Sequence, residues 1–192
     1  MHGLVIRSLQ RFLRDTYGEA LWEQVAQASD APRDGFEAFE IYDDAVTDAI
    51  VSTAARALGK PEESLLEDFG IYLSRVEVLR RLLRFSGADY VDFLLGLDEL
   101  PDRMRLALPE IQLPEMSLDP LGPGLYRLRC RCAAGRSAPV LAGILRAMAD
   151  DYGALALIDC SAPQGGEETV MIELLDNAYS VGRSFELTRA EC

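Results

Sequence analysis

Four cysteines are the side chains in this chain best suited to nucleophilic, redox or metal chemistry. They are arranged as Cys130-x-Cys132, followed by Cys160 and the terminal Cys192. Side chains two residues apart on a strand point to the same side, so Cys130 and Cys132 suit a soft metal or an oxidation sensor. The alternative is a pair of buried, inert thiols. The spacing matches no CxxC pair, and the chain lacks the histidines that would complete a zinc set.

Other groups that could do chemistry are few. His2 is the sole histidine, and we expect it to pack at the N-terminus rather than to bind a ligand. The sequence contains no P-loop, GxSxG or HExxH motif. Paired carboxylates at residues 43–44 and 150–151 lie at predicted helix ends, where capping and solvation explain them. We therefore expect a binding or sensor module and not an enzyme.

Composition is that of an ordinary globular chain. Of its 192 residues, 49% are hydrophobic and 27% are charged, which is sufficient for one good-sized core. No stretch approaches the roughly 20 apolar residues that span a bilayer. Arg7, Arg11 and Arg14 interrupt the first segment, which is therefore not a signal peptide. We expect a cytoplasmic protein that does not enter membranes.

The net charge of −13 argues against a nucleic-acid partner, because binding a polyanion depends on clustered Lys and Arg. Arginines cluster within residues 80–84 and 127–131. Such clusters are typical of solvated helix and strand faces, and the alternative is a docking surface for an acidic partner.

Apolar residues recur at helical spacing through the first part of the chain. The predicted helices cover residues 2–16, 19–28, 44–58, about 61–86, 89–97 and 103–108. Asp43 or Asp44 is expected to cap the third helix, and the fourth is expected to be interrupted or bent near Gly70. Pro101 suits either the end of one helix or the first turn of the next.

After Pro114 the pattern changes to strands. Tyr126, Leu128 and Cys130 alternate with arginines, as in a half-buried strand. The predicted elements are a hairpin of residues 116–120 and 125–132, a helix over 137–153, and strands over 154–160 and 169–175 joined by a loop. The predicted fold class is α+β, a helical N-terminal half followed by a ββαββ antiparallel-sheet half.

Several stretches carry a family resemblance. They are MHGLV with RDTYG, AVTDAIVSTAARALGKPEESLLEDFGIY, FLLGLDELPDRMRLALPEIQLP and the strand that ends near Cys130. Through them the chain resembles the heme nitric oxide/oxygen-binding (H-NOX) domain, a sensor module also found in soluble guanylate cyclase. The resemblance covers almost the whole chain. It implies one domain over residues 1–177, with a helical subdomain to about 112 and a sheet-bearing subdomain from about 113, and a tail over 178–192.

The resemblance also implies a heme site with altered residues. In the family, a histidine binds the heme iron, and a Tyr-x-Ser-x-Arg run holds the heme propionates. The histidine position falls on Pro101, and the run falls on Cys130, Cys132 and Ala134. Neither Cys nor Ala can give the directed bonds to carboxylates that Tyr, Ser and Arg give.

Three apolar positions match the family's pocket. Pro114 matches the proline that presses on the heme, and Val5 and Leu9 match the heme-contacting face of the first helix. The alternative is that Pro114 terminates a loop and that Val5 and Leu9 are plain core residues.

Taken with these changes, the resemblance implies a sensory or signalling module that has given up histidyl heme ligation and acts by protein contact or through another apolar ligand. Two alternatives stay open. One is a heme gas sensor with a non-histidine ligand from Cys130, Cys132, Tyr72 or Met104; the other is a redox or metal sensor built on the cysteine pair. The resemblance implies heme as the cofactor, whereas Pro101 favours none. The expected partner is a signalling protein such as a histidine kinase or a cyclic-nucleotide enzyme.

Overall fold

The order of elements confirms the predicted α+β class. The structure is a computed structural model that describes residues 2–32, 35–107, 113–131, 136–164 and 166–176. The first part holds α1 (Gly3–Tyr17), α2 (Glu19–Ala28), α3 (Asp44–Leu58), α4 (Glu62–Arg75), α5 (Glu77–Arg84), α6 (Tyr90–Leu95), the 3₁₀ helix η1 (Leu97–Glu99) and α7 (Leu100–Ala107). The second part holds β1 (Glu115–Gly122), β2 (Leu125–Arg131), α8 (Ser137–Tyr152), β3 (Leu155–Gln164) and β4 (Glu167–Asp176). Within the described residues, no helix is long and apolar enough to cross a bilayer.

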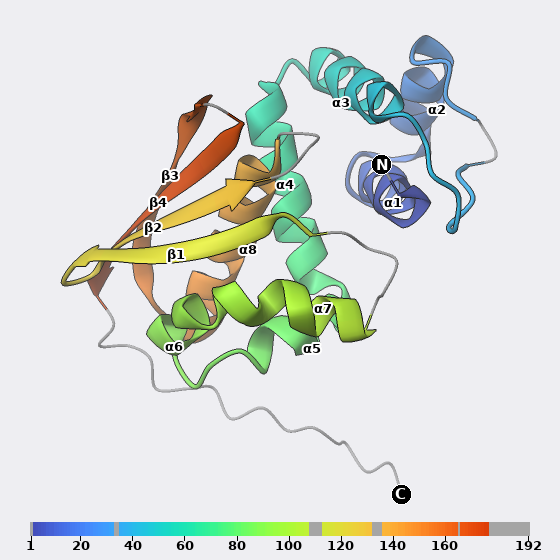
Figure 1. Ribbon diagram of the computed structural model, residues 1–192. Helices are drawn as coiled ribbons and strands as arrows, with labels where there is room; N and C mark the ends of the chain where they lie inside the picture. Colours follow the sequence, from blue (N-terminus) through green and yellow to red (C-terminus); the bar gives the residue numbers. More distant parts are fainter. Residues whose placement is uncertain (1, 33–34, 108–112, 132–135, 165, 177–192) are drawn as a thin grey trace, which may run out of the picture.

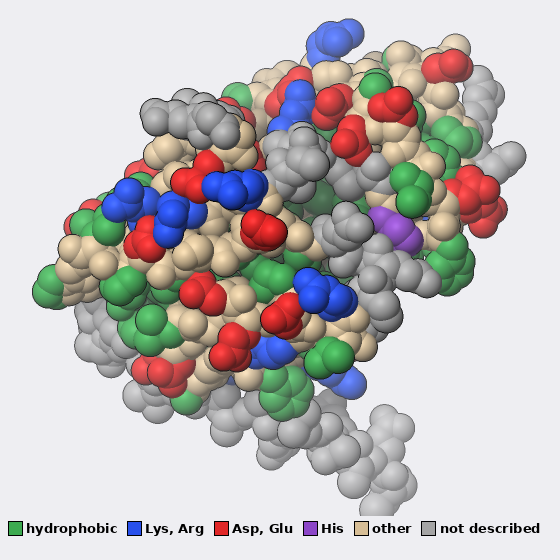
Figure 2. Space-filling view, viewed as in Figure 1, with side chains coloured by type: hydrophobic (Ala, Val, Ile, Leu, Met, Phe, Trp, Pro, Cys, Tyr) green, Lys and Arg blue, Asp and Glu red, His purple; other side chains and the backbone are tan. Residues whose placement is uncertain are grey.

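The four strands form one antiparallel sheet in the order β1-β2-β4-β3. Helix α8 covers one face (Figure 1). Leu128 and Cys130 point to that face and are fully buried, as the alternation predicts. On the other face, Arg129 Nε lies 2.8 Å from Asp119 Oδ2 and Arg131 pairs with a carboxylate of β4. Figure 2 shows basic and acidic side chains mixed over β1 and β2, so the arginine cluster there is largely neutralised by its neighbours.

Buried apolar side chains form two cores. The helical core is built from α1 to α4, and the sheet-side core is built from α5 to α8 and the inner face of the sheet. The two cores meet where α4 crosses α8. A Cβ on Gly70 would overlap the carbonyl oxygen of Val140, and one on Gly143 would overlap that of Glu67. The backbones of α4 and α8 therefore touch, which only glycine at these two positions permits.

Two predicted details are wrong. The predicted fourth helix is not interrupted at Gly70, since α4 runs through this residue, which lies against the backbone of α8. It breaks at Val76, whose extended backbone (φ −67°, ψ 120°) separates α4 from α5. The loop expected over residues 161–168 is also too long, since β3 continues to Gln164 and β4 begins at Glu167.

A pair of tyrosines ties α1 to α4. The hydroxyl of Tyr17 donates to Asp68 (3.0 Å), and the hydroxyl of Tyr72 donates to Asp15 (2.7 Å). The ammonium of Lys60 also donates to Asp68, at 2.7 Å. Burial raises the pKa of both phenols, so they stay protonated donors at neutral pH.

Candidate functional site

Pro101 is the second residue of α7 and is half-buried. Proline is well tolerated there because the N–H groups of a helix's first turn have no intrahelical partner. Its neighbours on the helix, Leu100 and Met104, are buried in the sheet-side core. The proline ring offers no atom that can coordinate a metal, so position 101 supplies only bulk.

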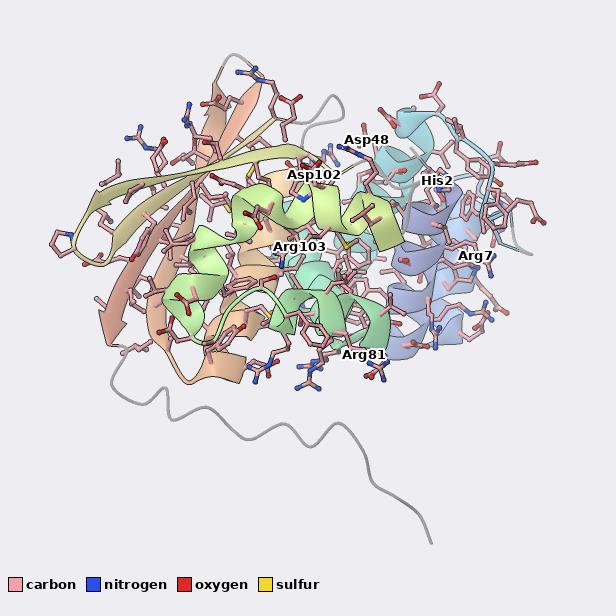
Figure 3. The ribbon with its side chains drawn as sticks, turned by 60° about the horizontal axis from the view of Figure 1, so that its bottom comes forward. His2, Arg7, Asp48, Arg81, Asp102 and Arg103 are labelled. Carbon is pink, nitrogen blue, oxygen red and sulfur yellow. The ribbon has the colours of Figure 1, made fainter. Side chains whose placement is uncertain are left out.

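Polar contacts fix α7 and η1 against their surroundings. One guanidinium nitrogen of Arg103 donates to Ser86 Oγ (2.8 Å) and to the carbonyl of Gly96 (3.1 Å). The carboxylate of Asp98 accepts the N–H of Leu118 on β1 at 2.8 Å. Figure 3 shows Arg103 on the side of α7 that faces α5 and α6. The helix that carries Pro101 is therefore held between α5, α6 and β1.

The sole histidine has a structural partner. His2 precedes α1, and its Nδ1 accepts the N–H of Leu4 at 3.3 Å, as an N-cap. The adjacent Gly3 donates its N–H to the carbonyl of Glu40 at 2.8 Å. His2 is thus engaged at the start of α1, on a different element from Pro101.

The apolar positions on α1 lie apart from those on β2. Leu9 is buried in the helical core and Val5, on the same helix, is half-buried. Pro114 is half-buried just before β1. Cys130 belongs to the sheet-side core. The structure brings Cys130 together with the α7 neighbours of Pro101, and it places Leu9 in the other core.

Cys130 is 0% exposed and lies opposite Met116 and Glu168 in the sheet register. Cys132 and Ala134 lie outside the described residues. Of the three residues that the resemblance matches to the Tyr-x-Ser-x-Arg run, only Cys130 therefore has a described environment, and its thiol is closed off from water.

A buried carboxylate next to Cys130 was missed by the sequence reasoning. Glu168 is 5% exposed. Its oxygens accept the backbone N–H groups of Arg136 (2.8 Å), Ser137 (2.8 Å) and Ala138 (3.2 Å), and also the hydroxyl of Ser137. These donors belong to the first turn of α8, where a negative charge is stabilised by unpaired N–H groups and the helix dipole. Glu168 therefore serves as the internal anion of this helix end.

Arg136 connects the same turn to the helical part of the molecule. Its φ of 64° is left-handed, and its guanidinium lies 3.0 Å from Glu62 and 3.5 Å from Asp48. Cys160 and Glu168 line the adjoining surface hollow. Cys160 is exposed at the surface, but partial desolvation of its thiol, together with nearby carboxylates, raises the pKa of this group to about 11. At neutral pH this thiol is protonated and therefore a weak nucleophile.

The remaining candidate ligands are also engaged or enclosed. The hydroxyl of Tyr72 donates to Asp15, and Met104 is buried in the sheet-side core. Within the described residues, no three His, Cys, Asp or Glu side chains converge to hold a metal ion.

Three comparisons place the chain among known proteins. It matches the Haem-NO-binding family model over residues 2–158, which are 157 of its 192 residues. It is similar to soluble guanylate cyclase gcy-31 of Caenorhabditis elegans, with 25% identity over 118 residues, or 59% of this chain and 17% of that protein. It is also similar to soluble guanylate cyclase 89Db of Drosophila melanogaster, with 25% identity over 121 residues, or 62% of this chain and 18% of that protein. The chain thus spans less than a fifth of either cyclase.

The solved structures that it resembles are H-NOX proteins. One from K. algicida has a TM-score of 0.79 at 14% identity and covers 93% of this chain and 99% of that one. One from S. oneidensis has a TM-score of 0.76 at 18% identity and covers 92% of this chain and 100% of that one. At these identities the likeness shows a shared fold.

Proposed function

The chain belongs to the haem-NO-binding family, and from this we propose that it is a non-catalytic sensory or signalling module of that family which has lost histidyl heme ligation. It acts by protein contact or by binding another apolar ligand. The observation that carries the proposal is the pair formed by Pro101 and His2. Pro101, which the resemblance matches to the family's histidine, lies in the first turn of α7, and the sole histidine caps α1.

The charges around Cys130 support the same proposal. The resemblance puts the heme propionates near this position, and propionates are anions. Glu168, opposite Cys130 in the register, is a buried carboxylate that already accepts the N–H groups of the α8 turn. A second carboxylate beside it would be repelled in a poorly screened environment. The residues present therefore do not fit a heme held in the family's manner.

Two other functions have weaker support. A heme bound through sulfur or phenolate would have to displace Cys130 or Met104 from the core, or Tyr72 from Asp15. A thiol sensor needs a reactive thiolate, whereas Cys130 is fully buried and the pKa of Cys160 is raised. Both functions stay as alternatives to be tested.

Visible absorption with added hemin tests the proposal. We expect the wild-type chain to give no specific Soret band at one equivalent of hemin, and His2→Asn, which keeps a capping side chain, to behave identically. Pro101→His restores the imidazole on α7, and a Soret band in this variant alone would mean that a pocket survives without its ligand. A Soret band in the wild type that shifts with reductant and with nitric oxide would contradict the proposal. Cys130→Ser and Met104→Leu would then identify the ligand.

The partner that we propose is a signalling enzyme, either a histidine kinase or a cyclic-nucleotide enzyme. The similar proteins are named as soluble guanylate cyclases, and this chain aligns with less than a fifth of their length. We further propose that the module comprises residues 1–177, divided near residue 112, and that residues 178–192 form a tail. The test is to add the purified chain to a purified kinase or cyclase from the same host. A change in autophosphorylation or in cyclic-nucleotide synthesis is expected, and no change with either enzyme would contradict the proposed partnership.

A further inference from the structure

The loop between α2 and α3 presents apolar side chains on a fixed backbone. Phe36 is buried in the helical core, whereas Phe39 is 76% exposed and Ile41 is 83% exposed. The ring of Phe36 packs edge-on against Tyr42 at 5.0 Å between centroids. We refer to residues 35–43 as the presenting loop.

Backbone contacts hold the presenting loop against the start of α1. The carbonyl of Glu40 accepts the N–H of Gly3 at 2.8 Å, and the hydroxyl of Tyr42 accepts the N–H of Glu37 at 2.9 Å. A Cβ on Gly3 would overlap the carbonyl oxygen of Glu37. The loop is therefore preorganised, and it loses little conformational entropy when a partner binds.

The charge of this loop is negative. Glu37, Glu40 and Asp43 flank its two exposed apolar residues, and within the described residues no cation lies within ion-pair distance of Glu37 or Glu40. The side chains of Phe39 and Ile41 face water, so they contribute no buried apolar surface to the fold of a single chain. Exposed apolar residues on a rigid support are typical of an interaction site.

A basic groove runs along α1 beside this loop. Arg7, Arg11 and Arg14 follow each other at helical spacing and line an open groove of about 800 Å³. Its lining also includes Leu4, Gln10 and two carboxylates, Asp15 and Glu19. Arg11 and Arg14 have exposed acidic neighbours at 3.4 Å and at 2.5 Å, whereas Arg7 has no ion pair within the described residues.

The loop and the groove belong to one face of the molecule. An added Cβ on Gly35 would come within 3.0 Å of the Gln10 side chain, so the loop begins against the groove. Figure 3 shows Arg7 and His2 on the edge of α1 that the loop passes. An acidic, apolar projection and a basic groove therefore lie side by side.

We propose that this face binds a second copy of the chain about a two-fold axis. The presenting loop of each copy enters the α1 groove of the other, so every contact is made twice. Glu37 and Glu40 pair with Arg7 and Arg11 of the facing copy. Phe39 and Ile41 cover Leu4 and the aliphatic stems of the arginines, which carry apolar surface up to their charged heads.

Charge favours a second copy over other occupants. An anionic membrane would attract the groove but repel the three carboxylates of the loop. A purely acidic or purely basic protein would match only one half of the face. A two-fold partner matches both halves at once, and the pairing closes without leaving an open surface for fibres. This inference is independent of whether the chain binds heme.

Charge reversal tests the pairing. Sedimentation and light scattering over a concentration series should give a wild-type mass that rises from 21.2 kDa to twice that value. A loop variant, Glu37→Arg/Glu40→Arg, places positive loops against positive grooves. A groove variant, Arg7→Glu/Arg11→Glu, places negative loops against negative grooves. Each variant alone should raise the dissociation constant at least about tenfold, because like charges meet in both contacts.

An equimolar mixture of the loop variant and the groove variant should form a heterodimer, because both of its contacts again join opposite charges. Phe39→Ser/Ile41→Ser should be monomeric, and Val78→Ser on α5, also an exposed apolar residue, should leave the mass unchanged. Circular dichroism confirms that each variant is folded. A wild-type mass of 21.2 kDa at every concentration, or a dimer that survives both reversals, would overturn the proposal.

Discussion

The carboxylate of Glu168 occupies the position that an external anion takes at many helix N-termini. Its sequence signal is alternation: Glu168, Val170 and Ile172 share the inward side of β4. A glutamate on that side is expensive to bury unless it is paired. The pattern could therefore have identified Glu168 as a charged residue on the buried side of a strand. It could not have named the partners, because the α8 turn lies about 30 residues earlier in the chain.

We expect Glu168→Gln to destabilise the fold by about 2–3 kcal/mol. The amide keeps one acceptor oxygen and turns an NH₂ group toward backbone donors, so buried N–H groups of α8 lose their partner. The matched control is Glu167→Gln, whose half-buried side chain pairs with Arg131 at 3.4 Å, and which should cost less than about 1 kcal/mol. Urea unfolding measures both. Equal costs for the two variants would show that the internal anion is dispensable.

The thiol of Cys160 should react slowly. Its pKa of about 11 compares with about 8.5 for a free cysteine. At pH 8.5 the thiolate fraction is then roughly a hundredfold lower than in the unfolded chain, and alkylation follows the thiolate. Mass spectrometry of the Cys160 peptide after timed iodoacetamide treatment gives the rate, with the urea-unfolded chain as reference. The folded rate should climb with pH up to about 11; a plateau near pH 9 would contradict the expectation.

At the scale of the elements, the sequence predicts those helix ends that depend only on residues close to them in the chain. Asp43 does cap α3, accepting the N–H of Ala45 at 2.9 Å. The interior of α4 shows the opposite case. Gly70 looks like a break from its own segment, but it is retained because α8 passes against it. The actual break, at Val76, carries no glycine or proline, so propensity does not reveal it.

For the candidate site, the alternation of β2 predicted that Cys130 points inward, and its burial confirms this. The expected match of position 101 to the family's histidine came from the resemblance and not from a local pattern. The role of His2 as a cap and the contacts of Arg103 depend on which segments the fold brings together, and no local pattern contains that information.

The glycine crossing of α4 and α8 predicts a sharp intolerance to a single methyl group. Gly143→Ala should cost about 3 kcal/mol, because the two helices must separate and their side chains lose packing. Gly122→Ala is the matched control, since nothing lies within 4 Å of its added Cβ. Thermal melts of both variants provide the comparison. A Gly143→Ala protein as stable as the control would mean that α4 and α8 are not in backbone contact in solution.

At the scale of the whole molecule, the two cores meet where α4 crosses α8, and we expect them to unfold together. Trp22, the sole tryptophan, is buried in the helical core, whereas Phe93 lies in the sheet-side core. Tryptophan fluorescence therefore reports on one core while a substitution is made in the other.

Phe93→Leu should lower stability by about 1–2 kcal/mol, and it should move the urea midpoint of Trp22 fluorescence as far as the midpoint of far-UV circular dichroism. Phe12→Leu in the helical core serves as the reciprocal variant. If Phe93→Leu leaves the Trp22 transition in place, the helical core folds as an independent unit.

The contact between Lys60 and Asp68 has a practical consequence. Lys60 is the sole lysine in the chain, and the hydrogen bond to Asp68 raises its pKa. Amine-directed conjugation then has one side chain to modify, at the junction of α1 and α4. The terminal α-amine deprotonates at a lower pH than Lys60 and reacts first, so it has to be blocked before labelling. A dye or a surface tether attached at Lys60 after that step holds the chain in one orientation.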